Sequence, residues 1–273
     1  MLFSIMEQAL IALPLIIGAY LTISLLKLPD FSIESAYLFG AVAAFLAKDL
    51  PLLLVIASAT IGGMFVGTIV SFLNQIFRIP FLLAAIVTNG LFHGITQYTL
   101  GTSVKSFSFE FPISEFFFLF ALGTCLVIFI MLMIRSQLGY SFAIFGNNPE
   151  FFSSHRISSK YVLFVGVIIG HGLAGISGFL FAQSSGFVDL TMNYGVILMC
   201  LTALMAGKLL AGLNYPNIII PIFGIIAFFL IQQSLLRLGL NLKYFNAFQA
   251  IFVLGVLLIG HRKKTLTLDH LGV

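Results

Sequence analysis

Residues 116–134 read FFFLFALGTCLVIFIMLMI, a run that contains no charged side chain and no proline. A helix rises about 1.5 Å per residue, so that about 20 apolar residues cross the hydrocarbon core of a bilayer. A strand of a membrane barrel would instead alternate apolar and polar residues over about 10 positions. The unbroken run therefore predicts a transmembrane α-helix.

The composition of the whole chain agrees with this prediction. Of its 273 residues, 60% are hydrophobic and only 8% are charged, whereas about 25% of the residues of a soluble domain are charged. The mean hydropathy is +1.14. The net charge of +4 comes from basic residues spread along the loops, so we expect lipid contact and no nucleic-acid partner. The sequence predicts an integral membrane protein.

Charges, prolines and glycines divide the apolar runs into helices. We predict an all-α, polytopic membrane helix bundle of about 8 to 10 transmembrane helices, which forms a single domain over residues 1–273. The candidate helices cover residues 7–26, 33–47, 51–76, 80–100, 113–134, 161–183, 193–211, 216–236 and 244–260.

The basic residues predict an orientation, because Lys and Arg concentrate in cytoplasmic loops. If the loop 136–160 and the basic tail 261–273 are cytoplasmic, nine of the 13 basic residues lie inside and the N-terminus lies outside. The inside set is Lys27, Arg78, Arg135, Arg156, Lys160, Lys208, Arg262, Lys263 and Lys264.

The stretch LPDFSIES at residues 28–35 interrupts the early apolar sequence. Proline ends a helix, and Asp30 or Ser32 can cap the next one. One interpretation is an ordinary cytoplasmic turn. The other is one broken early helix, whose break lies within the membrane and places Asp30, Ser32 and Glu34 beside a translocation pathway.

Polar residues inside apolar segments are the other candidates for a pathway. Asn89, His93 and Gln97 recur every four residues, so they share one helix face. His171 and Gln183 lie in a later segment. Such residues either form hydrogen bonds between helices or line a polar path, because their exposure to lipid is costly.

Small residues also recur every four positions, at Gly166, Gly170, Ala174 and Gly178, with a further pair at Gly63 and Gly67. Faces of this kind let two helices approach closely. We expect the contact to lie within one subunit rather than between two copies.

The loop 136–160 contains a short helix signal. Asn148 precedes Pro149, which suits the first position of a helix, and Glu150 suits the first turn. We expect a short amphipathic helix on the cytoplasmic face. Phe151 and Phe152 suit either lipid headgroups or the groove of a partner.

No constellation for catalysis stands out. The five His residues lack metal-site spacing on one helix, and Lys208 follows a glycine without the remainder of a phosphate-binding loop. We therefore predict no enzyme and no cofactor bound by this chain.

Three motifs carry a resemblance to a known family. FGNNPE at 145–150, GISGFLFAQ at 175–183 with GF at 186–187, and LPDFSIES leading into FGA at 39–41 resemble permease subunits of ATP-binding-cassette (ABC) importers. The superfamily is that of the branched-chain amino acid and ribose permeases, and within it the similarity is to the tryptophan or tyrosine type. One departure is Gly207-Lys208, where members commonly have Gly-Glu.

The resemblance implies a permease homodimer in a bacterial cytoplasmic (inner) membrane, two ABC ATPase subunits that bind ATP and Mg²⁺, and an extracytoplasmic solute-binding protein. The cargo would be a small organic solute such as an amino acid. The broken helix would lie near the translocation path, and one loop would form the coupling helix that docks on the ATPase. Its residues here are Gly146, Asn147, Asn148, Pro149, Glu150, Phe151, Phe152 and Arg156.

An ion- or proton-coupled secondary transporter or channel is the alternative. It would use Asn89, His93 and Gln97 together with Asp30 or Glu34 as an ion path.

Overall fold

The computed structural model describes residues 2–109, 114–148, 150–155, 158–212, 217–239 and 244–269. All nine predicted segments are helices. Their bounds are α1 Leu2–Ala19, α2 Ile33–Leu46, α3 Leu52–Ile76, α4 Phe81–Leu100, α5 Glu115–Ile134, α8 Ser159–Ser185, α9 Val196–Ala211, α10 Ile219–Arg237 and α11 Phe245–Asp269. The all-α prediction is thus confirmed.

Smaller elements complete the described chain. A π-helical turn, η1, continues α1 over Tyr20–Leu25, and two helices, α6 (Gln137–Asn147) and α7 (Glu150–Ser154), lie between α5 and α8. Two three-residue strands, β1 (Val104–Ser106) and β2 (Phe187–Asp189), pair antiparallel with Lys105 opposite Val188.

Five of the described helices are long and apolar enough to cross a membrane, so this is a multi-pass membrane protein. They are Phe3–Leu25, Leu52–Ile76, Glu115–Ile134, Ser159–Ser185 and Ile219–Arg237. Three shorter apolar helices accompany them, at Ile33–Leu46, Val196–Ala211 and Phe245–Val256.

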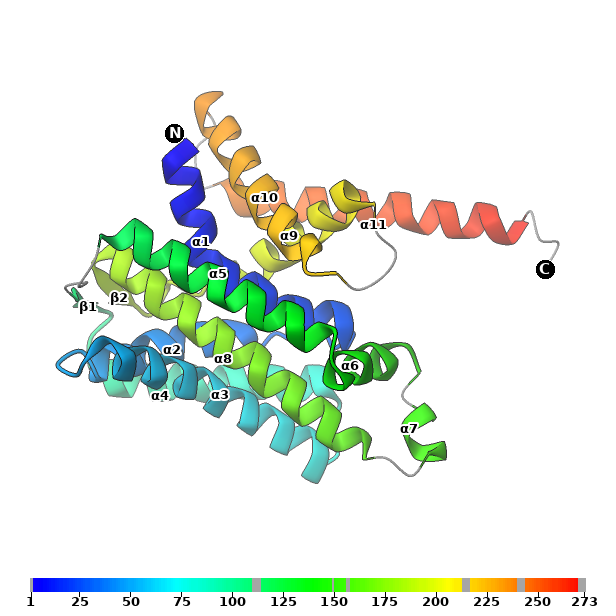
Figure 1. The fold of residues 1–273 in the computed structure, drawn as a ribbon, viewed down its shortest axis with the longest axis horizontal. Coiled ribbons are helices and arrows are strands. Elements are labelled where there is room, and N and C mark those ends of the chain that lie inside the picture. Colours follow the sequence, from blue (N-terminus) through cyan, green and yellow to red (C-terminus); the bar gives the residue numbers. More distant parts are fainter. Residues whose placement is uncertain are drawn as a thin grey trace.

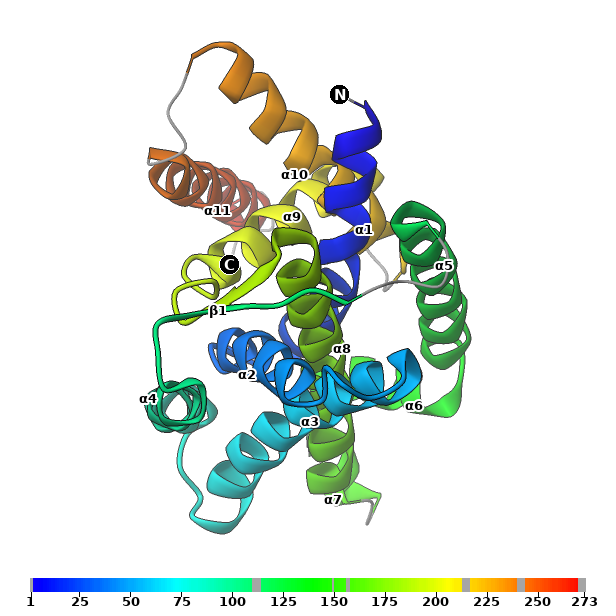
Figure 2. The same cartoon turned by 90° about the vertical axis from the view of Figure 1, so that its left-hand side faces the viewer.

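Helix α8 lies at the centre of the bundle. Figure 2 looks along the long axis of the molecule and shows α8 next to α1, α2 and α3, the three helices that pack most closely against it. Residues 170–180 of α8 are all buried, which explains why this helix is apolar and rich in small residues on every side.

Glycines permit the close packing around α8. Gly40 of α2, Gly63 of α3 and Gly175 of α8 meet, and a Cβ built on Gly175 would overlap the carbonyl oxygen of Ala59. Gly170 meets Gly18 of α1 in the same manner. The prediction that the small-residue face packs within the subunit is therefore confirmed.

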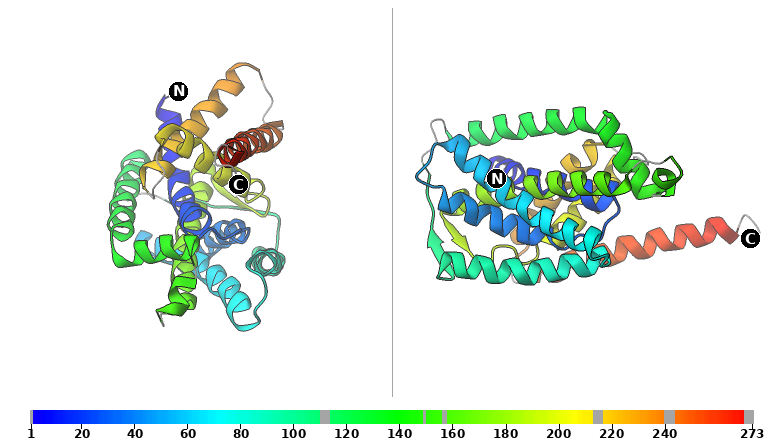
Figure 3. Two further views of the ribbon diagram at one scale, coloured as in Figure 1. Left: turned by 90° about the vertical axis from the view of Figure 1, so that its right-hand side faces the viewer. Right: turned by 90° about the horizontal axis from the view of Figure 1, so that it is seen from below.

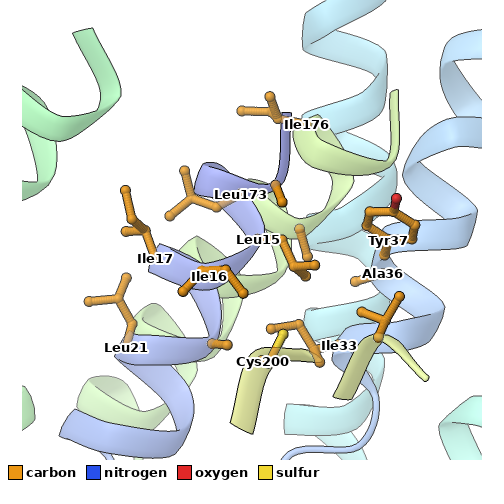
Figure 4. Packing of buried hydrophobic residues seen from close by; sticks show 14 of the residues in the cluster. Leu15, Ile16, Ile17, Leu21, Ile33, Ala36, Tyr37, Leu173, Ile176 and Cys200 are labelled. Atoms are coloured by element: carbon orange, nitrogen blue, oxygen red, sulfur yellow. The ribbon is translucent and has the colours of Figure 1, made fainter. Parts of the chain in front are cut away.

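The remaining helices lie around this centre. Helices α9, α10 and α11 group on one side (Figure 1), and α4 and α5 lie along opposite edges in the right-hand view of Figure 3. The side chains of Leu15, Ile16, Ile33 and Cys200 pack where α1, α2 and α9 meet (Figure 4).

Two parts of the chain are more helical than expected. The loop 136–160 contains α6, whose Phe142 is fully buried, in addition to the short α7. Helix α11 continues to Asp269 through residues expected to form a tail, because HRKKTLTLD contains no glycine or proline to end it. It projects beyond the bundle on the same side as α6 and α7 (Figure 1).

Candidate functional site

The early helix is interrupted between Leu25 and Ile33. The π-helical turn ends it, with the amide of Leu26 donating to the carbonyl of Leu21 at 3.0 Å. Lys27 follows with φ at +53°, a left-handed conformation that is costly for a residue with a side chain. The chain thereby turns back, and the short helix α2 starts from the break.

Three buried side chains meet at this break. Ser32 Oγ lies 2.7 Å from Asp30 Oδ1 and 2.9 Å from His171 Nε2. His171 Nδ1 lies 2.9 Å from the carbonyl oxygen of Val167 and 3.8 Å from Asp30 Oδ2. Asp30 is 1% exposed and His171 0%, so water does not compete for these contacts.

Proton counting limits the states of this cluster. A hydroxyl has one proton to donate, so Ser32 cannot donate to both Asp30 and His171. The contact that Ser32 does not donate to needs its proton from the other partner, while Asp30 Oδ2 has no hydrogen-bond partner among the described residues.

The part of the break next to α2 lies at mid-height of the bundle. His171 is next to the centre of α8, and Asn89 is near the centre of α4. Asn89 accepts a hydrogen bond from Ser35 and donates to the carbonyl of Phe31 at 2.9 Å. Both helices thus contact the break at their middles, an arrangement that favours the discontinuous helix over an ordinary turn at the membrane surface.

Two other predicted pathway residues make structural contacts. Glu34 accepts a hydrogen bond of 3.0 Å from the amide of Ile197 in the first turn of α9, where the helix dipole favours a carboxylate. Gln183 pairs its amide with the backbone of Phe109 through bonds of 2.9 and 2.7 Å. Neither side chain reaches the Asp30, Ser32 and His171 cluster by a hydrogen bond described in the structure.

The predicted polar stripe lies on one helix, α4, but its three members differ in exposure. Asn89 is half-buried at the break, whereas His93 and Gln97 are exposed on α4. The ion path that would join His93 and Gln97 to Asp30 is therefore not assembled within one copy of the chain, and the secondary-transporter interpretation loses its main support.

The predicted coupling segment touches the break directly. Lys27 Nζ donates to Asn147 Oδ1 at 2.6 Å, and a Cβ built on Gly146 would overlap the carbonyl oxygen of Leu25. Lys27 was not predicted as a member of this site, because 120 residues separate it from Asn147. The one local signal for Lys27 in the sequence is its position two residues before Pro29-Asp30.

The residues predicted to form the coupling segment differ in how much of each side chain is exposed. Asn147, Asn148 and Glu150 are exposed, while Phe152 is 2% exposed and lies 6.3 Å from the ring of Phe145. Phe152 thus anchors α7 to its own chain. Phe151 is half-buried and stacks on His155 at 4.0 Å. Pro149 and Arg156 lie outside the described residues.

A comparison with known families identifies the family of this chain. Residues 1–259 match the family described as branched-chain amino acid transport system / permease component. The chain belongs to this family. It is a permease subunit of an ABC importer for a small solute.

Two relatives illustrate the relationship of this permease to known proteins. A tyrosine transport system permease protein of Clostridioides difficile (strain R20291) is 29% identical over 213 residues, 76% of this chain and 72% of that protein. An uncharacterized protein of Rickettsia prowazekii (strain Madrid E) is 29% identical over 255 residues, 88% of this chain and 90% of that protein. No solved structure matches the permease.

Proposed function

We propose that this permease imports a small organic solute of the amino-acid class across a bacterial cytoplasmic membrane. It would act as a pair of copies with two ATPase subunits, which bind ATP and Mg²⁺, and with an extracytoplasmic solute-binding protein. The family membership and the tyrosine permease among the relatives support this proposal.

All nine long or apolar helices would cross or enter the membrane, with the N-terminus outside and α6 and α7 inside. The five long spans alone do not account for the short α2, α9 and the apolar part of α11. A helix of 14 residues such as α2 covers only about 21 Å, which suits one half of a discontinuous crossing that starts at mid-height.

The observation that carries the coupling role is the contact between α6 and the break. ATP hydrolysis on the partner would move α6 and α7 through their exposed residues Asn147, Asn148 and Glu150. Because Gly146 lies against Leu25 and Lys27 bonds Asn147, this movement would act on the break. The contact between Ser32 and His171 would transmit this movement to the centre of α8.

Reconstitution tests this coupling. The permease is assembled with its ATPase and binding protein in proteoliposomes, and solute-stimulated ATP hydrolysis and uptake are measured. Asn148→Ala combined with Glu150→Ala should abolish the stimulation and uptake while the complex still assembles. The matched control is Asp49→Ala, which removes an exposed carboxylate from the loop after α2 and should leave both activities unchanged. Normal uptake by the double variant would refute the coupling assignment.

A further inference from the structure

A cavity of about 400 Å³ lies between the two groups of helices, and the coupling segment does not contribute to it. Its walls come from α1, α2, the last turns of α8, and the three helices α9, α10 and α11. Residues 181–185 are at the opposite end of α8 from α7. Since α8 is about 40 Å long, the cavity lies at the far end of the bundle from α6 and α7, which is the outer half in the proposed orientation.

Aromatic rings form much of the wall. The ring centroids of Tyr37 and Phe181 lie 6.1 Å apart, and those of Phe228 and Phe245 lie 5.6 Å apart. The aromatic lining residues are Tyr37, Phe181, Tyr194, Phe228, Phe229 and Phe245. Such walls favour a flat apolar ring, because aromatic pairs gain from edge and offset contacts in addition to burial.

Amides supply the polar part of the wall. Gln249 is 5% exposed, and its Oε1 has no hydrogen-bond partner among the described residues; the same holds for Oε1 of Gln232. A buried acceptor without a donor costs about 1 to 3 kcal/mol. Both side chains line the cavity, so that rotation of either amide would turn its oxygen toward a molecule there with N–H or O–H groups.

None of the lining residues carries a charge. The polar ones are Gln8, Ser184, Ser185, Gln232, Asn246 and Gln249, together with the two tyrosines. A net charge would have no opposite charge to pair with and would be costly to bury. Opposite charges on one solute compensate each other, and amides and hydroxyls can both donate to and accept from them.

From these walls we infer that the cavity binds the transported solute, and that this solute is a small molecule without net charge that combines a flat ring with hydrogen-bond donors. A zwitterionic aromatic amino acid meets each condition, and the volume lies within the usual range of about 300 to 1,000 Å³ for ligand sites. The inference rests on the proposed function and specifies its substrate class. Polar side chains in apolar runs signal this site in the sequence: Asn246 and Gln249 are three residues apart and share one face of α11, but no local pattern joins them to Gln232 of α10.

The test is direct binding. The permease–ATPase complex is placed in nanodiscs without its binding protein, and the affinities for L-tyrosine, L-phenylalanine, L-tryptophan, L-lysine and L-glutamate are measured. At least one of the three aromatic amino acids should bind at least tenfold more tightly than lysine and glutamate. Equal affinity for all five, or no binding by any of the five, would overturn the inference.

Variants locate the site. Gln249→Leu and Gln232→Leu keep the approximate size but remove the amide, and each should weaken binding about tenfold. Gln233→Leu makes the same change at a neighbour that does not line the cavity and should leave the affinity unchanged. Ser184→Phe fills the cavity from an exposed position of the wall and should abolish binding even if an amide variant fails to fold. Wild-type affinity in folded Gln249→Leu and Ser184→Phe would refute the assignment.

ATP-dependent uptake separates this inference from the proposed function. If wild-type complex imports the aromatic amino acid and the cavity variants import it equally well, the importer function stands and the cavity assignment fails. If wild-type complex binds the amino acid in the cavity but ATP never drives uptake, the importer function fails and the site stands.

Discussion

At the scale of single residues, the break depends on a group of buried polar partners. Ser32 lies within hydrogen-bond distance of both Asp30 and His171 inside the bundle, while Asp30 Oδ2 has only the 3.8 Å approach of His171 Nδ1, so that removal of one member leaves the others with fewer partners. Breaking a buried pair commonly costs about 3 to 5 kcal/mol. The cluster therefore stabilises a turn that the left-handed Lys27 and the missing amide of Pro29 make unfavourable.

We expect Asp30→Ala and His171→Ala each to lower the free energy of unfolding by about 3 kcal/mol. The double variant should lose less than the sum, because the two side chains share Ser32. Thermal unfolding in detergent measures all three proteins. Strict additivity would show that Asp30 and His171 do not act as one unit.

Glu34 has a different role, since its carboxylate caps α9 from across the bundle. Glu34→Ala should destabilise the protein by about 1 kcal/mol and speed amide hydrogen exchange in the first turn of α9. Glu34→Gln keeps an acceptor oxygen and is the control. If the exchange rate of the Ile197 amide were unchanged in Glu34→Ala, the hydrogen bond from Ile197 to Glu34 would not stabilise the first turn of α9.

The sequence indicated these residues but not their partners. Asp30, Glu34 and His171 stand out because acids and histidines are rare in apolar segments. Their contacts join positions 139 and 163 residues apart, and no local pattern encodes such pairs. For the same reason the exposure of His93 and Gln97 could not be predicted: helical spacing places them on one face with Asn89 but does not determine which part of that face a neighbouring element covers.

At the scale of helices, apolar run length predicted all nine long segments because a lipid-exposed backbone must satisfy its own hydrogen bonds. The π-helical turn at Tyr20–Leu25 was not predictable, since its residues are as apolar as those of α1. Helix α6 was missed because QLGYSFAIFGN is short and polar at both ends, and its stability comes from packing of Phe142 and Gly139 rather than from its pattern.

Two glycines provide a matched test of helix packing. Gly175→Ala would place a methyl group against the carbonyl of Ala59, whereas a Cβ on Gly94 meets nothing within 4 Å. We expect Gly175→Ala to prevent assembly of the folded bundle or lower its melting temperature sharply. Gly94→Ala should instead stabilise α4 by up to about 1 kcal/mol. Equal melting temperatures for the two variants would contradict the packing of α8.

At the scale of the whole molecule, the basic residues separate between the two ends of the bundle. Arg78 and Lys160 line one cavity with Phe145 of α6, and Lys27 is bonded to Asn147. Lys105 lies in β1, which pairs with β2 at the opposite end of α8. Charge counting therefore predicted which basic residues share an end. It could not predict how α9, α10 and α11 are placed against the other helices, because these contacts join residues far apart in the sequence, such as Glu34 and Ile197.

Labelling in intact cells tests the orientation. In a Cys125→Ser background, where the remaining Cys200 is buried, Lys48→Cys should react with a membrane-impermeant maleimide added from outside. Arg78→Cys should react only after the cells are opened. The reverse pattern would invert the proposed topology without changing the fold.

The cavity described above lies on the boundary between two groups of helices, with α1, α2 and α8 on one side and α9, α10 and α11 on the other. A solute bound there would therefore hold the two groups of helices together. While it is present the halves are held together by its contacts with both walls, and once it leaves, they share less surface and can separate more easily. The cargo itself would thus help to time the movement that carries it.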